Sequence, residues 1–209
     1  RDYVTWRNEL PEGEEQVRGV RVLRFPVEEE RDLAAFNAFA EPLYARETTR
    51  EEEVEFLRLQ GPVVPSLVEA LRAEKDRFAA VVFFTYLYAP TYWGLRAAPE
   101  RAALVPTTHD EPPLRFSVYR EVFGAPRAFG FLTPAEEALV RARFPLGERK
   151  AFLVGMGVEV LSAPDAASFR ARHGLDRPYL LYAGLFYDGK SFAEGKGVPA
   201  SVGRGGARV

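Results

Sequence analysis

Hydrophobic positions in the first third of the chain change their spacing after residue 27. Within residues 19–27 apolar residues alternate with arginines, a period of two that predicts a partly exposed strand suited to a sheet edge. Within residues 28–75 they recur three and four positions apart. That spacing predicts two or three packed helices, separated near Arg46 and at Gly61-Pro62.

The middle of the chain alternates short apolar runs with helical segments. Residues 78–85 are almost wholly apolar, as expected for a strand buried on both faces of a parallel sheet. The same reasoning predicts strands at 102–107, 127–132 and 151–154, and helices at 86–97, 114–123 and 134–144. This alternation implies right-handed crossovers, and hence an α/β fold with a doubly wound, mainly parallel, Rossmann-like sheet.

The last part of the chain has a different pattern. A helix is predicted at 165–173 with Gly174 as its stop, and residues 179–184 begin another buried strand. After Gly184 the apolar pattern gives way to Gly, Lys, Ser and Arg, which is typical of a flexible tail. We therefore expect a first domain over residues 1–162, an interdomain crossing at 163–177, and the start of a second domain with its tail at 178–209.

Composition narrows the class of protein. The formal net charge of −2 provides no basic excess for binding nucleic acid, and the absence of cysteine excludes disulfides and thiolate metal sites. No apolar run reaches the roughly 18–20 residues of a membrane-spanning helix. The first residues, Arg1-Asp2-Tyr3, resemble neither a signal peptide nor a natural start. We expect a cytoplasmic protein without a transmembrane segment or a nucleic-acid partner, whose true N-terminus lies upstream.

Candidate chemistry is expected where strands leave the sheet. Ligands of doubly wound sheets bind beyond the carboxyl ends of the strands, so Thr85, residues 107–111, Thr133 and residues 155–159 should line one edge. His109, with two carboxylates beside it, could donate to a sugar hydroxyl or accept a proton. The alternative is a histidine that only caps the sheet edge, because an isolated His-Asp pair is a weak motif.

Other polar and aromatic segments have a structural and a functional interpretation. Thr133, Pro134 and Glu136 predict a helix start with a capping box, and that N-terminus would also favour an anion. The Gly-x-Gly at 155–157 is a tight strand exit or a place where a ligand meets the backbone. Most aromatic residues within 83–93 are expected in the core, with one or two facing the ligand-binding cleft at the sheet edge. The acidic runs at 28–30 and 51–53 are expected to be solvated helix starts. No spacing of the two histidines with carboxylates predicts metal ligands.

Six segments together, in this order and spacing, resemble the retaining, family-four glycosyltransferases with two Rossmann-like domains, the GT-B type. They are FPVEEERDL, VVFFTYLYAPTYWGL, LVPTTHDEPPL, FGFLTPAEEALVRARF, GMGVEVL and RPYLLYAG, within residues 1–184. The resemblance implies transfer of a hexose, with retention, from a nucleotide-diphosphate sugar to a hydroxyl of a sugar, a polyol or a lipid-linked acceptor. It implies an acceptor-side first domain with no cofactor bound in it, and a donor-side second domain.

The resemblance also implies roles for individual residues. His109 matches the cleft histidine that contacts the donor sugar and is the catalytic candidate, and Lys190 keeps the place of a lysine on the donor diphosphate. The turn at 157–159 matches the Gly-Val-Asp turn before the interdomain crossing. The substrate-binding candidates are Thr85, Tyr86, Asp110, Glu111, Thr133, Glu136, Gly157 and Glu159.

The chain departs from the family pattern near both ends. The first strand and its glycine-rich loop would precede Arg1, Leu185 stands where the family has an arginine, and the paired glutamates of the donor site do not follow. We therefore expect a fragment that is inactive alone, with a truncated or frame-shifted end from Leu185 onward. One alternative is a non-catalytic Rossmann-like binding or interaction module. Another is a nicotinamide-dependent enzyme on the same type of sheet, but the G-x-G-x-x-G fingerprint of such enzymes is absent from the sequence.

Overall fold

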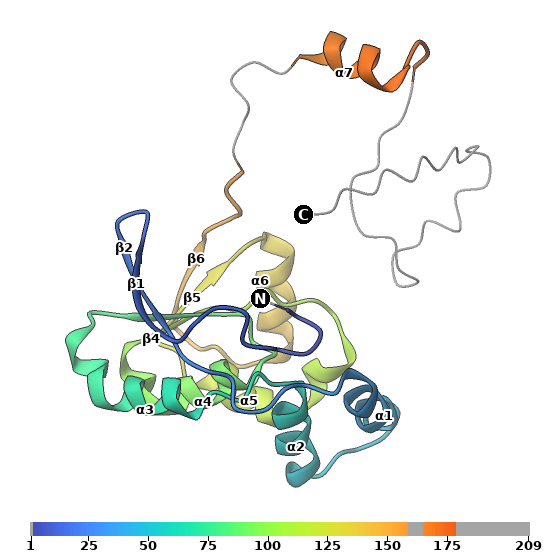
Figure 1. The fold of residues 1–209 in the computed structure, drawn as a ribbon. Helices are drawn as coiled ribbons and strands as arrows, with labels where there is room; N and C mark the ends of the chain where they lie inside the picture. Colours follow the sequence, from blue (N-terminus) through green and yellow to red (C-terminus); the bar gives the residue numbers. More distant parts are fainter. Residues whose placement is uncertain (1, 159–164, 179–209) are drawn as a thin grey trace. The chain divides into compact units, whose positions relative to one another are not determined.

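The structure, a computed structural model, describes residues 2–158 and 165–178. It divides into two compact units, residues 1–158 and residues 159–209, which are described separately. In the first unit a hairpin and three helices precede four strands that alternate with helices (Figure 1). These elements are β1 (Gly13–Val17), β2 (Val20–Arg24), α1 (Leu33–Leu43), α2 (Arg50–Gln60), α3 (Pro65–Glu74), β3 (Val81–Phe84), α4 (Ala89–Ala97), β4 (Ala102–Val105), α5 (Val118–Gly124), β5 (Ala128–Phe131), α6 (Pro134–Arg143) and β6 (Lys150–Leu153), with short 3-10 turns at Lys75–Arg77, Pro99–Arg101 and Pro112–Arg115.

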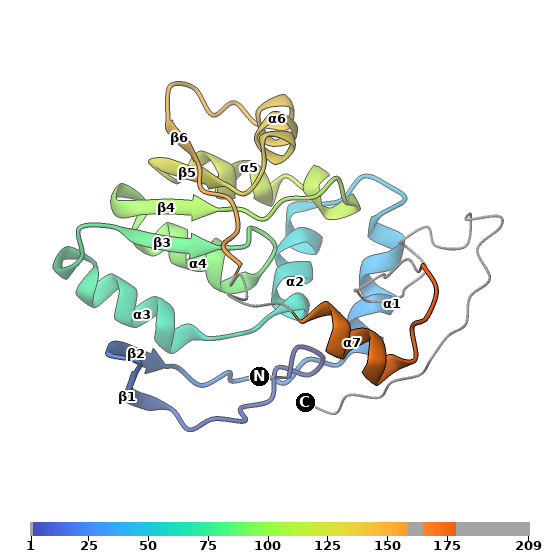
Figure 2. The same ribbon diagram turned by 90° about the horizontal axis from the view of Figure 1, so that it is seen from above.

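The main sheet has four parallel strands in the order β3-β4-β5-β6 (Figure 2). The predicted α/β class with a parallel, Rossmann-like sheet is confirmed. Strand order follows chain order, as in one half of a doubly wound sheet, so right-handed crossovers place α4, α5 and α6 on the same face. Accordingly the three helices share one hydrophobic core with the sheet.

The core lies between that helix-covered face and the helices. Phe83, Leu104 and Phe129 stand in register on neighbouring strands and point into it. Helices α1 and α2 add Phe36, Phe56 and Leu57, although both precede the sheet in sequence. The predicted helices within 28–75 are confirmed, and their breaks fall at residues 44–49 and 61–64.

The opposite face of the sheet is open on its outer strands. Val82 is 52% and Phe84 65% exposed on β3, and Phe152 is 57% exposed on β6. The prediction that 78–85 is buried on both faces is therefore wrong. β3 is an outer strand whose alternate side chains point away from the helices, whereas Val105 and Gly130 on the central strands are buried on the same face as Phe84.

The N-terminal strands form a sheet of their own. β1 pairs antiparallel with β2, so the strand predicted at 19–27 belongs to a hairpin and not to an edge of the main sheet. Arg18 and Gly19 connect the two strands with φ values of 49° and 79°, the backbone of a tight hairpin turn. The segment before the hairpin is anchored by Trp6, whose indole N–H donates to the Gln60 carbonyl at 2.8 Å.

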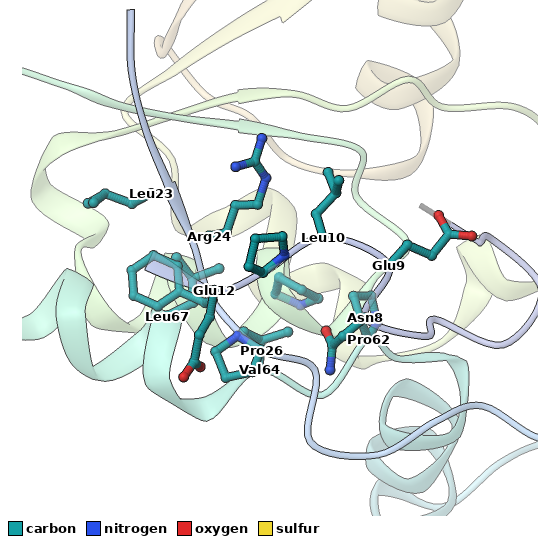
Figure 3. Close-up of a pocket in the computed structure, with 13 residues that line it drawn as sticks. Asn8, Glu9, Leu10, Glu12, Leu23, Arg24, Pro26, Pro62, Val64 and Leu67 are labelled. Atoms are coloured by element: carbon teal, nitrogen blue, oxygen red, sulfur yellow. The ribbon is translucent and has the colours of Figure 1, made fainter. Parts of the chain in front are cut away.

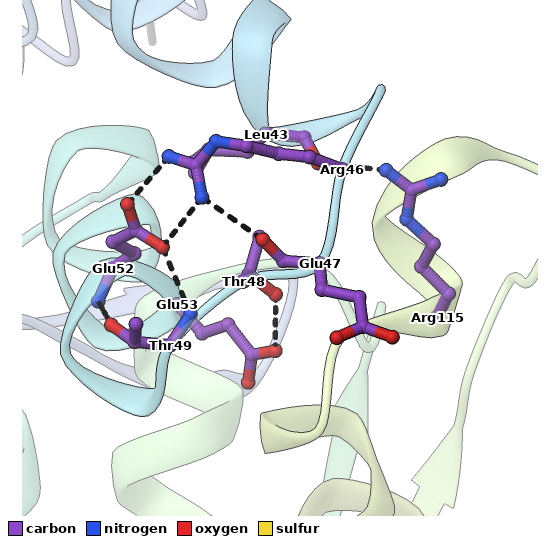
Figure 4. Close-up of polar contacts among 8 residues, drawn as sticks. All are labelled: Leu43, Arg46, Glu47, Thr48, Thr49, Glu52, Glu53 and Arg115. Atoms are coloured by element: carbon purple, nitrogen blue, oxygen red, sulfur yellow. Dashed lines mark hydrogen bonds and ion pairs between the residues drawn. The ribbon is translucent and has the colours of Figure 1, made fainter.

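The acidic run at 51–53 is only partly the solvated helix start that its composition indicates. Glu52 completes a capping box with Thr49 at the start of α2. Glu53 is instead 3% exposed. Its carboxylate accepts from the Thr48 hydroxyl at 2.7 Å (Figure 4), the Ser117 N–H at 2.9 Å and the Val118 N–H at 3.0 Å, and so caps α5. The acidic run at 28–30 precedes α1 without starting it, because the N-cap is Asp32.

Backbone geometry explains the outcome of two other helix predictions. Residues 114–123 were expected to form one helix but contain the end of a 3-10 turn and most of α5, because Phe116 between them is extended, with φ −63° and ψ 141°. In the second unit α7 (Ala166–His173) is capped by Asp165 and ends at Gly174, which adopts φ 61°. The helix and the glycine stop predicted there are confirmed.

Candidate functional site at the carboxyl edge of the sheet

The backbone takes an unusual conformation where β3 and β4 end. Thr85 and Thr107 adopt φ values of 63° and 52°, a region that β-branched residues rarely occupy. Thr85 is held there by its N–H bond to the Val105 carbonyl at 2.9 Å and by the Thr91 hydroxyl, which donates to the Thr85 carbonyl at 2.7 Å. Both strands therefore turn sharply at the edge where ligands of such sheets bind.

A carboxylate joins these two strand exits. The hydroxyl of buried Tyr86, after β3, donates to Oε1 of Glu111, after β4, at 2.7 Å. Tyr119 packs edge-on against Tyr86 with ring centroids 4.8 Å apart, and its hydroxyl donates to the Leu87 carbonyl at 3.1 Å. Oε2 of Glu111 accepts no hydrogen bond from a described residue. Because Glu111 is only half-buried, Oε2 can accept a hydrogen bond from a ligand bound at this edge of the sheet.

Electrostatics keep the surrounding phenols protonated. Burial, and then the negative charge of Glu111, raises the pKa of Tyr86 far above its ordinary value of 10.0. The pKa of Tyr119 is raised for the same two reasons, in the same order. Burial and Glu111 also raise the pKa of Tyr44, which brings α1 into this group. The three tyrosines, which together with Glu111 are here called the tyrosine–Glu111 cluster, therefore keep their protons at neutral pH and can donate hydrogen bonds.

A second carboxylate joins the exits of β4 and β5, but it is used internally. Glu136 accepts from the Thr108 N–H and from the Leu132 N–H, both at 2.7 Å. Its own N–H donates to the Thr133 hydroxyl at 3.0 Å, so the predicted N-cap of α6 is confirmed. The capping box is not, because the Glu136 side chain reaches these two loops and not the Thr133 N–H. This carboxylate already occupies the N-terminus of α6, where an external anion was expected.

The histidine and its neighbour lie on the surface of the same edge. His109 is exposed and makes no hydrogen bond or ion pair with a described residue. Asp110 is also exposed and pairs with Arg143 of α6 at 2.7 Å. His109 is thus accessible to a ligand, while Asp110 is engaged in fixing its loop against α6.

The remaining predicted site residues are less well connected. Gly155 leaves β6 with φ 64°, a strand exit like those of β3 and β4. Gly157 is exposed and has no described bond to the tyrosine–Glu111 cluster or to His109. Glu159 and Lys190 lie outside the described residues. The structure therefore joins the candidates near residues 85, 108–111 and 133–136, and does not link Gly157 to them.

Three residues of this edge were missed by sequence reasoning. Tyr44, Tyr119 and Arg143 contribute two phenols to the cluster and the ion pair to Asp110. Each lies between about 30 and 70 positions from its partner, and such contacts leave no local pattern in one sequence. Of the aromatic run, Phe83, Tyr86 and Tyr92 are core residues as expected, and Phe84 and Trp93 are exposed.

Searches against known proteins provide no relative to guide the assignment. The chain matches no protein-family model, no curated protein and no solved structure. None of the helices in the described residues has the length and apolar character needed to cross a membrane. Within the same residues no three His, Asp or Glu side chains gather as metal ligands would.

Proposed function

We propose that this chain is part of a retaining glycosyltransferase that moves a hexose from a nucleotide-diphosphate sugar to an acceptor hydroxyl. The observation that carries the proposal is the Tyr86–Glu111 bond at 2.7 Å, which holds a half-buried carboxylate close in sequence to exposed His109. A carboxylate and an imidazole are the usual partners of sugar hydroxyls, because each can accept a hydrogen bond in a fixed direction. Further support is the strained exit of both strands, which is common at ligand sites.

In this proposal the residues have separate tasks. Through Oε2, Glu111 accepts a hydrogen bond from a hydroxyl of the bound sugar, and the bond from Tyr86 to Oε1 holds that carboxylate in position. His109 contacts the hexose and positions it for transfer, a positional contribution that lowers the entropic part of the barrier. Glu136 shapes the edge without touching the ligand. The proposal places the protein in the cytoplasm, with no nucleic-acid partner and no cofactor in this half.

Sugar binding to the purified chain tests the proposal. We expect nucleotide-hexoses or free oligosaccharides to give saturable signals in ligand-observed NMR, and His109→Ala to weaken them by roughly tenfold. His173→Ala is the matched control, because it removes the other histidine, at the end of α7 in the second unit. Glu111→Gln should weaken the same ligands while leaving the fold intact.

The outcomes separate the proposal from its rivals. Binding that depends on His109 and Glu111, without turnover of the donor by this chain, is the expected result for a glycosyltransferase part that is inactive alone. Binding that neither substitution alters would favour a non-catalytic module that uses another surface. Absence of binding to every nucleotide-hexose and glycan tested would contradict the proposed function.

A further inference from the structure

Two cavities adjoin at the loop before α3, and Pro62, Val64 and Pro90 line both of them. The larger, of ≈ 670 Å³, lies beside the hairpin, and its wall mixes polar residues such as Asn8 and Arg24 with apolar ones (Figure 3). The smaller, of ≈ 310 Å³ and here called the three-helix cavity, has its wall on α2, on α3 with the loop before it, and on the start of α4. No residue of the tyrosine–Glu111 cluster lines either cavity.

The wall of the three-helix cavity is fixed by backbone bonds that do not require a ligand. The Gly61 N–H donates to the Leu57 carbonyl at 3.0 Å, and the Ala89 N–H donates to the Gly61 carbonyl at 3.2 Å, so the loop is tied to both α2 and α4. The Glu28 N–H donates to the Val63 carbonyl at 2.9 Å. A ligand would therefore enter a preformed site and lose little binding energy in ordering the protein.

Apart from four charged residues, the wall of the three-helix cavity is apolar. Val64, Val68 and Ala89 are each at most 8% exposed, and Trp93 adds an indole ring that is 38% exposed. The other apolar residues of the wall are Val54, Pro62, Val63, Pro65 and Pro90. A polar or charged ligand group that enters among them gives up water and finds few partners, which costs binding energy.

The four charged residues of the wall balance one another. Glu55 and Arg58 pair at 2.7 Å, and Arg58 also pairs with Glu29, which lies outside the cavity. Glu69 and Arg72 have opposite charges and are both exposed, three positions apart on α3. Two carboxylates and two guanidinium groups leave the wall without a net charge, so it favours neither a cation nor an anion.

The volume and the indole ring indicate the size and kind of ligand. An apolar cavity of about 150 Å³ is enough for one benzene ring, and ≈ 310 Å³ is about twice that volume. Tyr92 packs edge-on against Trp93, with ring centroids 4.8 Å apart, and so supports the indole ring in the wall. Aromatic rings gain from contact with such a ring beyond the area that they bury.

We propose that the three-helix cavity binds an uncharged aromatic molecule of about two fused rings. The ligand packs against Val64, Val68 and Trp93. This binding does not depend on glycosyl transfer. A nucleotide-diphosphate sugar is anionic, so it is not the occupant of this cavity.

Three ligands that share one ring system test the choice of an uncharged molecule. We expect naphthalene to bind the purified chain with saturation in ligand-observed NMR. The anion 2-naphthoate and the cation 2-naphthylmethylammonium should each bind at least about tenfold more weakly, because a charged group leaves water for an apolar wall without net charge. Affinity of either ion equal to that of naphthalene, or no saturable binding of naphthalene, would overturn the proposal.

The two tryptophans of the chain report where naphthalene binds. Trp93 lines the three-helix cavity, whereas Trp6 is 3% exposed and lines neither of the two adjoining cavities. We expect naphthalene to shift the indole N–H signal of Trp93 in a nitrogen–proton NMR spectrum and to leave that of Trp6 in place. A shift confined to Trp6 would place the ligand elsewhere and contradict the proposal.

Substitutions separate the aromatic wall from the rest of the surface. Trp93→Leu should weaken naphthalene roughly fivefold, and Trp93→Phe, which keeps a ring, should restore most of the affinity. Leu10→Ala is the matched control, because Leu10 is exposed and lines only the larger cavity, so naphthalene binding should not change. A urea unfolding midpoint close to that of the parent shows that each variant is folded. Equal weakening by Leu10→Ala and Trp93→Leu would overturn the assignment to this cavity.

A second copy of the chain is the rival occupant, and dilution without ligand tests it. An indole signal of Trp93 that moves with protein concentration would mean that another copy fills the cavity, and the proposal would fall. His109→Ala and Glu111→Gln should leave naphthalene binding unchanged, because neither residue lines the cavity. Failure of this proposal and failure of the proposed function are therefore distinguishable.

Discussion

Glu53 is the buried carboxylate on which the junction of α2 and α5 depends. Glu53→Ala would leave the Thr48 hydroxyl and the N–H groups of Ser117 and Val118 without their acceptor in a nearly water-free place. We expect the free energy of unfolding to fall by about 2–4 kcal/mol, since several buried donors lose their partner together. Urea unfolding measures it. Glu51→Ala, on the exposed face of the same helical turn, should change stability by less than about 0.5 kcal/mol, and an equal loss in both variants would contradict this role.

Glu52 is a partly exposed carboxylate whose titration reports the local structure. Hydrogen bonds from Arg46, and then from the Thr49 N–H, lower the pKa of Glu52 from 4.5 to about 2. A lowered folded pKa means that this group stabilises the fold above pH 4.5, and that the contribution is lost as the pH falls toward about 2. Carboxyl carbon NMR should follow this titration directly.

Arg46 provides the matched test of that pKa. In Arg46→Ala the pKa of Glu52 should rise toward its ordinary value, because the larger of its two causes is removed, while the bond from the Thr49 N–H remains at 2.8 Å. Arg46→Lys should give an intermediate value, since lysine keeps the charge but cannot form the paired contact. A pKa of Glu52 that stays the same in Arg46→Ala would show that the ion pair does not form in solution.

Sequence reasoning at the residue scale succeeded where the partner is a few positions away. The Thr133 cap of α6 is such a case, because its bond reaches only to Glu136. The same reasoning failed for the Glu136 side chain, whose bond to Thr108 spans 28 positions. The Tyr86–Glu111 bond spans 25 positions and was likewise not predicted as a pair, although each residue was a candidate. Which candidates touch is decided by the sheet that brings strand ends together.

At the scale of elements, apolar spacing predicted the helices and the parallel strands, because each buries a periodic set of side chains. It missed β1, whose sequence GEEQV is exposed at every position. That strand exists because the turn at Arg18-Gly19 folds it onto β2, and turn geometry is not an apolar pattern. Paired backbone groups thus define an element that hydrophobicity does not indicate.

The packing of α4 against β3 depends on a helix residue without a side chain. A Cβ added at Gly94 would lie 2.5 Å from Cε1 of Phe83 and 3.3 Å from Cδ1 of Leu71. Alanine favours a helix over glycine by about 1 kcal/mol, but Phe83 is a core residue that cannot move aside freely. We expect Gly94→Ala to lower the free energy of unfolding by about 1–3 kcal/mol net, measured by urea or thermal unfolding.

Gly124 is the matched control for that substitution, because it lies in α5 and a Cβ there would meet nothing within 4 Å. Gly124→Ala should leave stability unchanged or raise it by up to about 1 kcal/mol. If Gly94→Ala proved as stable as Gly124→Ala, α4 would not lie as close to β3 in solution as the structure places it.

At the scale of the whole first unit, helices cover one face of the sheet, and the other face is open on its outer strands. The sequence VVFF of β3 could not show this, because an apolar residue at every position is equally compatible with cover on either face. Only strand order and crossover direction decide it, since they place α4, α5 and α6 on one side. The open face carries Val82, Phe84, Phe152 and Val154, each more than half exposed.

Neighbouring phenylalanines on β3 allow the two faces to be compared directly. Phe83→Ala removes a ring packed against Gly94 and the core and should lower the free energy of unfolding by about 3–5 kcal/mol. Phe84→Ala removes a ring that is 65% exposed and should change it by about 1 kcal/mol or less. The same contrast in the loss of unfolding free energy is expected near the opposite edge of the sheet, between buried Phe131 on β5 and exposed Phe152 on β6.

The open face should also govern how the folded unit behaves toward apolar dyes and toward other copies. We expect the double variant Phe84→Ser, Phe152→Ser to bind less of the dye ANS and to self-associate less in light scattering than the parent chain, because it removes two large exposed apolar rings from this face. Its urea unfolding midpoint should stay close to that of the parent, because the substitutions remove exposed apolar surface without destabilising the fold. Unchanged dye binding together with a large fall in the midpoint would mean that both rings are buried in solution and that this face is covered.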